Sequence, residues 1–82
     1  MRILITGGTG TVGTAIIREY QAEHDFAVIS RNEAQHAAFR QEFPDVQCFL
    51  GSIENISQLL AAYQKFRPEV VVHAAAVKHI DL

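Results

Sequence analysis

A glycine-rich segment near the start of the chain constrains its fold more than any other feature. Residues 6–13 read Thr-Gly-Gly-Thr-Gly-Thr-Val-Gly, which places Gly7, Gly10 and Gly13 at regular spacing. The segment follows an apolar run at 2–6 and precedes a helical stretch, the strand–turn–helix context in which such glycines bind phosphate. The first glycine permits a tight turn, the second lets a pyrophosphate approach the backbone, and the third lets the helix pack closely. The helix N-terminus would offer free N–H groups and a partial positive charge to the phosphate.

A second phosphate-binding motif is excluded by one residue. Gly8 and Gly13 have the spacing of a P-loop, but Thr14 stands where that motif needs a lysine. Without a lysine to reach the β- and γ-phosphates, we do not expect a nucleoside triphosphatase. A glycine-rich turn with no ligand is the other interpretation of residues 6–13.

The rest of the chain alternates short apolar runs with longer helical stretches. We predict strands at 2–6, 26–30, 46–50 and 70–73, with helices at about 11–21, from Asn32 to before Pro44, and at 55–66. Nearly continuous apolar runs of this length are typical of parallel strands buried on both faces. Right-handed crossovers then predict the first half of a Rossmann-type, doubly wound α/β fold with strand order 3-2-1-4.

Local patterns indicate how two of the helices begin and what they bury. Asn32 precedes Gln35, and Asn55 precedes Gln58, at the spacing of a capping box, in which Asn caps a backbone N–H and Gln reaches back. The third helix should turn one apolar stripe to the sheet, made of Ile56, Leu59, Leu60, Tyr63 and Phe66. The expected core anchors of the second helix are Phe39 and Phe43.

The predicted sheet is incomplete at one edge. In a full doubly wound sheet the fourth strand pairs with a fifth, so the apolar run at 70–72 would form an exposed edge. A domain of 82 residues also buries only about 60% of its unfolded surface and is marginal alone. We therefore expect residues 1–82 to be a dinucleotide-binding segment of a larger domain, or a protein whose copies associate to cover the edge.

Composition excludes several classes of protein. The formal net charge is −2, so neither nucleic acid nor a membrane surface is an expected partner. The N-terminal part has no signal peptide or membrane span, and we expect a cytoplasmic chain. The lone Cys48 is expected to be a small core residue. His24, His36, His73 and His79 make no metal-ligand pattern, and His73 is expected to be a hydrogen-bonded structural residue.

The end of the second predicted strand bears on which dinucleotide would bind. It reads Ser30-Arg31-Asn32, with no Asp or Glu to accept from a ribose 2′-hydroxyl. Ser30 can donate a hydrogen bond to a 2′-phosphate, and Arg31 can offer a planar guanidinium. A charged hydrogen bond contributes about 1.5–3 kcal/mol, which is roughly a tenfold to hundredfold preference. These residues predict NADP rather than NAD; the alternative is that Arg31 is simply a solvated surface residue.

Three segments together resemble a known family. The glycine loop, the I-S-R-x-E segment at 29–33 and the H-A-A-A-x-K-H segment at 73–79 are similar to the extended short-chain dehydrogenase/reductase superfamily. The similarity is greatest to the polysaccharide-biosynthesis nucleotide-sugar 4,6-dehydratases, such as those acting on UDP-N-acetylglucosamine. It covers all 82 residues but only the N-terminal part of such an enzyme. It implies an NADP cofactor, a UDP-N-acetylglucosamine-like substrate and a homo-oligomer.

The resemblance also implies roles for individual residues. The residues expected to bind the cofactor are Gly7, Thr9, Gly10, Thr11, Val12, Gly13, Ser30, Arg31, Ser52, Ile53, Ala74, Ala75, Ala76 and Lys78. The glycines would hold the pyrophosphate, Ser30 and Arg31 would meet the 2′-phosphate, and the alanines would line the cleft. Ser52 stands where the family usually has an Asp near the adenine amino group, and Asp81 stands where it usually has Pro.

The resemblance implies a reaction for which this chain carries no catalytic residue. In the family, bound NADP⁺ takes hydride from sugar C4, water is lost across C5–C6, and the hydride returns to C6. This chemistry needs a Tyr-x-x-x-Lys pair, in which lysine lowers the pKa of the tyrosine. Four residues after Tyr20 and Tyr63 stand His24 and Arg67, not lysine.

Two functional hypotheses follow for the chain. The first is the cofactor-binding portion of a nucleotide-sugar 4,6-dehydratase or related epimerase, without the catalytic half. The second is a non-catalytic chain that binds NADP or associates with itself through the open strand edge. A simple ketoreductase of the same superfamily is a weaker alternative.

Overall fold

The computed structural model describes residues 1–7, 9–31, 33–52 and 54–74, which alternate strands and helices as the sequence predicts. The elements in chain order are β1 (Arg2–Thr6), α1 (Thr11–Tyr20), β2 (Asp25–Ser30), α2 (Glu33–Glu42), β3 (Gln47–Leu50), α3 (Ile56–Phe66) and β4 (Val70–His73). Each predicted element is present, and its ends lie within about one residue of the expected ones.

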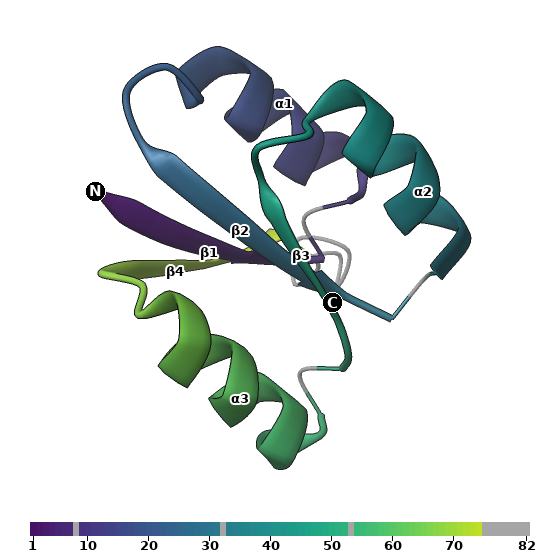
Figure 1. Ribbon diagram of the computed structural model, residues 1–82, viewed down its shortest axis with the longest axis vertical. Helices are drawn as coiled ribbons and strands as arrows, with labels where there is room; N and C mark the ends of the chain where they lie inside the picture. The colour runs from purple at the N-terminus through teal and green to yellow at the C-terminus, as the bar shows by residue number, and fades with distance from the viewer. Residues whose placement is uncertain (8, 32, 53, 75–82) are drawn as a thin grey trace, which may run out of the picture.

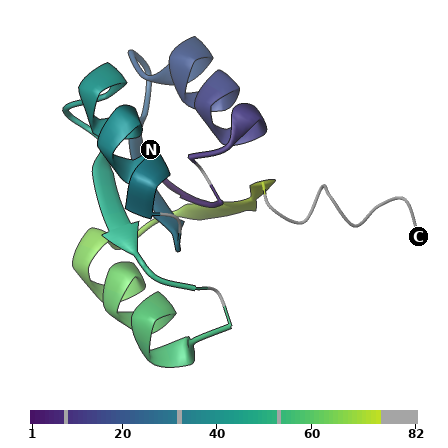
Figure 2. The same cartoon turned by 90° about the vertical axis from the view of Figure 1, so that its right-hand side faces the viewer.

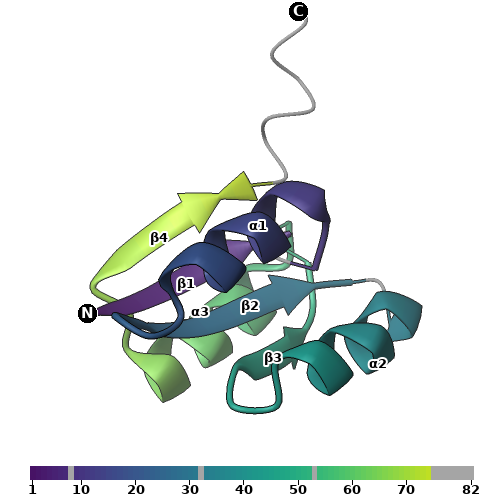
Figure 3. The same cartoon turned by 90° about the horizontal axis from the view of Figure 1, so that it is seen from above.

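The strands form one parallel sheet in the order β3-β2-β1-β4 (Figure 3). Ile3 of β1 is in register with Phe26 of β2 on one side and with Val70 of β4 on the other. Helices α1 and α2 cover one face of the sheet, and α3 covers the other (Figures 1 and 2). This arrangement confirms the predicted Rossmann-type fold and its strand order, because successive right-handed crossovers place helices on both faces.

Each face of the sheet has its own apolar core, because successive side chains on a strand point to opposite faces. Ile5 and Val28 belong to the cluster that includes α1 and α2 residues, whereas Leu4 and Ala27 belong to the cluster on the α3 side. The expected anchors Phe39 and Phe43 are 4% and 2% exposed. Full burial of a side chain of this size contributes about 1.5–3 kcal/mol, so these rings fix α2 firmly on the sheet.

Helix α3 begins with the predicted cap but not with the full capping box. Asn55 Oδ1 accepts from the Gln58 N–H at 3.2 Å, as expected. Gln58 does not reach back to Asn55; its Oε1 accepts from the Ser52 N–H at 2.9 Å. The Asn55 N–H donates instead to the Ser52 carbonyl at 3.0 Å, so this donor is satisfied without the glutamine side chain. The corresponding cap at Asn32 lies outside the described residues.

The predicted apolar stripe of α3 is only partly correct. Ala62 and Phe66 are buried against the sheet, and Leu59 packs beside them. Ile56, Leu60 and Tyr63 are instead 70%, 52% and 47% exposed. Leu60 and Tyr63 each follow a sheet-facing residue, so they lie about 100° further round the helix and turn away from the sheet.

Candidate functional site

The carboxyl ends of the parallel strands bring several predicted site residues to one edge of the sheet. The Gly7 N–H after β1 donates to the Ile29 carbonyl of β2 at 2.8 Å. The Gly51 N–H after β3 donates to the Ser30 carbonyl at 3.0 Å. The loops that follow three neighbouring strands are therefore tied together at the edge where doubly wound sheets bind ligands.

The glycine loop leaves the start of α1 open to an anion. Gly7 has a φ of 67°, a left-handed conformation that glycine adopts without strain. Gly10 is the N-cap of α1, makes no side-chain cap bond, and is followed by no acidic residue in the first turn. Among the described residues, a Cβ added at Gly10 would approach the Gly7 carbonyl oxygen, at an ordinary 3.5 Å. Packing against these residues therefore does not require glycine there, whereas a phosphate resting on the backbone would.

The other predicted loop residues lie around this helix start. Gly13 is a buried residue of the first turn of α1, as expected for close packing of the helix on the sheet. Thr11 and Val12 are exposed in the first turn, where their backbone N–H groups belong to the open helix end. Together with Gly10 they form the part of the loop that can meet a diphosphate.

A polar cluster joins the glycine loop to β2 and α2. Thr9 Oγ1 lies 3.1 Å from Ser30 Oγ and 3.0 Å from Gln35 Oε1. Thr9 and Ser30 were both expected at the site, and the structure brings them into hydrogen-bond contact. Gln35 was expected only as part of a cap, and its place beside Thr9 depends on how α2 packs against the loop.

His36, the next residue on α2, also reaches the end of β2. It is 3% exposed, and its Nε2 lies 3.0 Å from the Ser30 carbonyl oxygen. This contact could not be predicted from the sequence, because a histidine at that helical position has no distinctive spacing from the strand end.

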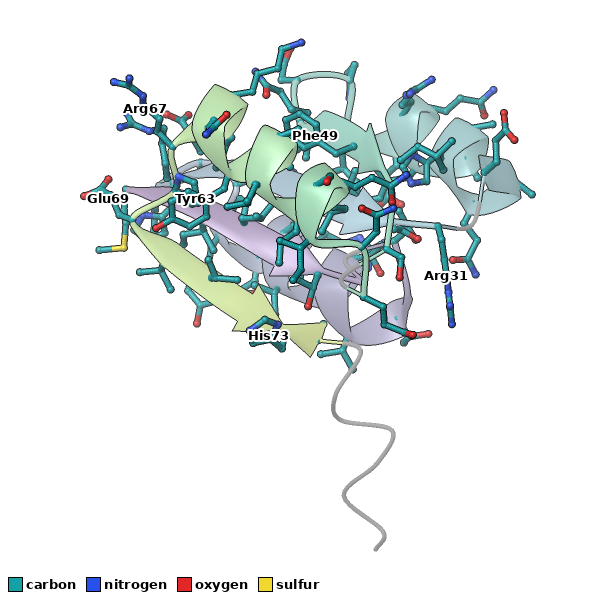
Figure 4. The ribbon with its side chains drawn as sticks, turned by 90° about the horizontal axis from the view of Figure 1, so that it is seen from below. Arg31, Phe49, Tyr63, Arg67, Glu69 and His73 are labelled. Atoms are coloured by element: carbon teal, nitrogen blue, oxygen red, sulfur yellow. The ribbon has the colours of Figure 1, made fainter. Side chains whose placement is uncertain are left out.

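Arg31 extends into solvent beyond β2 (Figure 4) and meets an acidic residue from the neighbouring loop. Its Nη1 is 3.8 Å from Glu54 Oε1, and the two side chains are 77% and 81% exposed. The Glu54 N–H donates to Ser52 Oγ at 3.1 Å, which holds the loop after β3 in place. This carboxylate was not expected from the sequence, because Glu54 lies in the loop after β3 and not at the end of β2.

The last predicted segment is described only at its first residues. His73 Nδ1 lies 3.1 Å from the buried Thr6 Oγ1, which confirms a hydrogen-bonded role, although the His73 side chain lies exposed on the edge strand (Figure 4). Ala74 is 7% exposed and joins the core cluster on the α1 side. The remaining predicted residues lie outside the described part of the chain: Ile53, Ala75, Ala76 and Lys78.

Other chemistry at the described residues is limited. Burial raises the pKa of the Cys48 thiol, and the nearby Arg40 opposes this only in part. The thiol is therefore protonated at neutral pH and packs beside the core, as expected of a structural cysteine. Residues 1–7, 9–31, 33–52 and 54–74 contain no group of three or more His, Cys, Asp or Glu that could hold a metal ion. No helix in the same ranges has the length and apolarity needed to cross a bilayer.

Comparison with known proteins supports a common origin along almost the whole chain. Residues 3–82 match the family model described as "Polysaccharide biosynthesis protein". The dTDP-glucose 4,6-dehydratase of Haemophilus influenzae is 36% identical over 95 residues, an alignment that covers 99% of this chain and 26% of that enzyme. The chain thus spans about a quarter of the length of this curated relative.

Solved structures agree with the sequence relatives. The enzyme WbmG of Bordetella bronchiseptica in complex with NAD is 31% identical, with a TM-score of 0.78 over 90% of this chain and 24% of that chain. The same enzyme in complex with NAD and UDP gives a TM-score of 0.76 at 29% identity, over 88% of this chain and 24% of that chain. These comparisons confirm the predicted resemblance to nucleotide-sugar dehydratases and the Rossmann-type fold.

Proposed function

The chain belongs to the polysaccharide biosynthesis protein family, and on that basis we propose that it is the dinucleotide-binding N-terminal portion of a nucleotide-sugar 4,6-dehydratase or a related epimerase. The observation that carries this proposal is the open N-terminus of α1, which follows a glycine loop at the carboxyl edge of the sheet. The cofactor would be a nicotinamide dinucleotide, because WbmG, a relative of matching fold, is described in complex with NAD.

Different groups among the described residues would hold the pyrophosphate and the adenosine ribose of the dinucleotide. The backbone at Gly10 and the first-turn N–H groups of α1 would bind the pyrophosphate, helped by the positive end of the helix dipole. Ser30 and Arg31 would meet the adenosine ribose at the end of β2. When bound, the nicotinamide supplies a hydride acceptor, and this chain's part is to bind and orient it. Ser52, Ile53, the alanines at 74–76 and Lys78 complete the proposed contacts.

We favour NADP over NAD at this site. Ser30 and Arg31 offer a hydroxyl and a guanidinium at the end of β2, which has no carboxylate of its own to accept from a 2′-hydroxyl. The carboxylate of Glu54 lies 3.8 Å from Arg31 and would repel a 2′-phosphate, which would reduce the preference for NADP. NAD, the dinucleotide bound by WbmG, is the alternative cofactor.

The substrate and partners of the whole protein follow from the same relationship. We propose a nucleotide sugar of the UDP-N-acetylglucosamine kind, acted on in the cytoplasm by a homo-oligomer. The dTDP-glucose 4,6-dehydratase relative and the UDP complex of WbmG support a nucleotide-sugar substrate. The second candidate, a non-catalytic chain that associates with itself, is favoured by the exposed Val70 on edge strand β4.

The decisive experiment separates binding from folding at Gly10. We expect NADPH to bind the wild-type chain in a fluorescence titration, and Gly10→Ala to lower its affinity at least about tenfold. The melting temperature should hardly change, because in the described part of the chain the added Cβ would meet the Gly7 carbonyl oxygen at an ordinary 3.5 Å. Failure of the wild type to bind either NADPH or NADH would overturn the proposal, as would equal affinity in a folded Gly10→Ala variant.

A further inference from the structure

His36 is a buried titratable side chain that the proposed cofactor contacts do not use directly. It is 3% exposed, and its Nε2 lies 3.0 Å from the Ser30 carbonyl oxygen. A carbonyl oxygen can only accept, so Nε2 carries a hydrogen and donates it. The bond links the second turn of α2 to the last residue of β2.

The Ser30 carbonyl is held from two directions. It accepts from His36 on α2 and from the Gly51 N–H after β3, at 3.0 Å in each case. A carbonyl oxygen has two lone pairs, so both are engaged here. This carbonyl belongs to the rigid, planar peptide unit that joins Ser30 to Arg31, so its orientation fixes the direction in which the chain leaves the strand.

The side chain of Ser30 is held from the same helix. Its Oγ lies 3.1 Å from Thr9 Oγ1, and Thr9 lies 3.0 Å from Oε1 of Gln35, the residue before His36. Helix α2 is therefore connected to the end of β2 in two ways. His36 bonds directly to the Ser30 carbonyl, and Gln35 is linked to the Ser30 hydroxyl through Thr9. Both contacts act on the residue pair that would recognise the 2′-phosphate.

We propose that His36 is a positioning residue that sets the discrimination between NADP and NAD through the Ser30–Arg31 peptide. The inference rests on the proposed function. Without the donor, this part-buried carbonyl loses its contact with α2 and keeps its contact with the Gly51 N–H of the β3 loop. Arg31 then loses its fixed starting direction, which costs more affinity for a 2′-phosphate than for a 2′-hydroxyl.

The test is the ratio of NADP⁺ to NAD⁺ affinity in a series of His36 variants of the chain, measured by calorimetric titration. Glutamine can place an amide N–H near the position of Nε2, whereas asparagine is too short to reach the Ser30 carbonyl. We expect His36→Asn and His36→Leu to lower the ratio about fivefold to tenfold, the equivalent of one hydrogen bond. His36→Gln should stay within about twofold of the wild type.

Two further variants separate positioning from loss of stability. Phe39→Leu removes buried volume from the same helix without touching Ser30, so it should lower the melting temperature and leave the ratio unchanged. Ser30→Ala keeps the backbone carbonyl but removes the hydroxyl. In the Ser30→Ala background, His36→Asn should still lower the ratio of NADP⁺ to NAD⁺ affinity, because it still acts on Arg31. In an Arg31→Ala background, His36→Asn should no longer change that ratio.

The outcomes distinguish this inference from the function on which it rests. An unchanged ratio in both His36→Asn and His36→Leu would overturn the role of His36 alone, as would an equal fall in Phe39→Leu. A His36→Gln variant that behaves like His36→Asn would also overturn it. Absence of binding to either dinucleotide in the wild type would instead overturn the proposed function, and the inference with it.

Discussion

Arg31 lies against Glu54, and a 2′-phosphate in the proposed site would compete with that carboxylate for the guanidinium. Its guanidinium lies 3.8 Å from the Glu54 carboxylate, and both side chains are largely exposed. A phosphate carries more charge than a carboxylate and accepts from both arms of a guanidinium, so it competes well for Arg31. The negative charge of Glu54 would repel that phosphate, and salt would weaken this repulsion because the Glu54 side chain is exposed to solvent. We therefore expect Arg31 to raise the preference for NADP and Glu54 to reduce it.

Substitutions at this pair should move the affinity for NADP⁺ in opposite directions. Arg31→Ala should lower it about tenfold or more, because a charged hydrogen bond is lost. Glu54→Gln should raise it about threefold, and more at low salt than at high salt. NAD⁺ affinity should change little in either variant, and Glu23→Gln, on an exposed turn beyond α1, is the control. An unchanged NADP⁺-to-NAD⁺ ratio in Arg31→Ala would contradict the NADP assignment.

The sequence predicted those parts of the candidate site that depend on local order along the chain. The positions of Gly10 and Ser30 at the carboxyl edge of the sheet could be predicted, because a loop after the first strand and the end of the second strand can be located by hydrophobic pattern alone. Gln35, His36 and Glu54 were not predicted at the candidate site, because they reach Thr9, Ser30 and Arg31, respectively, only through packing of α2 and the β3 loop. No spacing rule relates a helix side chain to a carbonyl on the preceding strand.

At the level of the helices, the cap at Asn55 was predicted better than the buried face of α3. Asn55 caps α3 as expected because the bond to the Gln58 N–H forms within one turn. The partner of the Gln58 side chain was predicted wrongly, since its Oε1 goes to Ser52 in the preceding loop. Leu60 was also misplaced, because the rotation of α3 about its own axis is decided by contact of Ala62 and Phe66 with the sheet.

The cap at Asn55 gives a stability prediction. Asn55→Ala should lower the free energy of unfolding by about 1 kcal/mol, because the Gln58 N–H loses its acceptor. Asn55→Asp keeps an acceptor oxygen and adds a negative charge at the helix N-terminus, so it should be close to the wild type. Urea denaturation followed by circular dichroism measures both, with Ser57→Ala as the control in the same turn. Equal destabilisation by Ala and Asp would show that the cap bond is not what matters.

Across the whole molecule, the two faces of the sheet are covered unequally. In the part of the chain that the structure describes, helices α1 and α2 share one face, α3 covers the other, and β4 is the edge strand on its side of the sheet (Figure 1). Ile56, Leu60 and Tyr63 of α3 are exposed, and so is Val70 of β4. Exposed apolar side chains on a helix and on a strand at the edge of the described sheet favour association with another protein surface. This asymmetry is the structural basis for the proposal that copies of the chain associate.

We expect the 82-residue chain to associate with itself in a concentration-dependent way, and Leu60→Lys to weaken that association. Leu60 is 52% exposed, so the substitution should change the free energy of unfolding by no more than about 0.5 kcal/mol. Leu59→Lys is the matched comparison, because Leu59 packs against the core and its replacement should destabilise the fold.

Sedimentation velocity over a range of concentrations measures association. A wild-type chain that stays monomeric, or a folded Leu60→Lys variant that associates equally well, would argue against this face as the contact surface. Reduced association with stability retained would place the contact on the exposed side of α3.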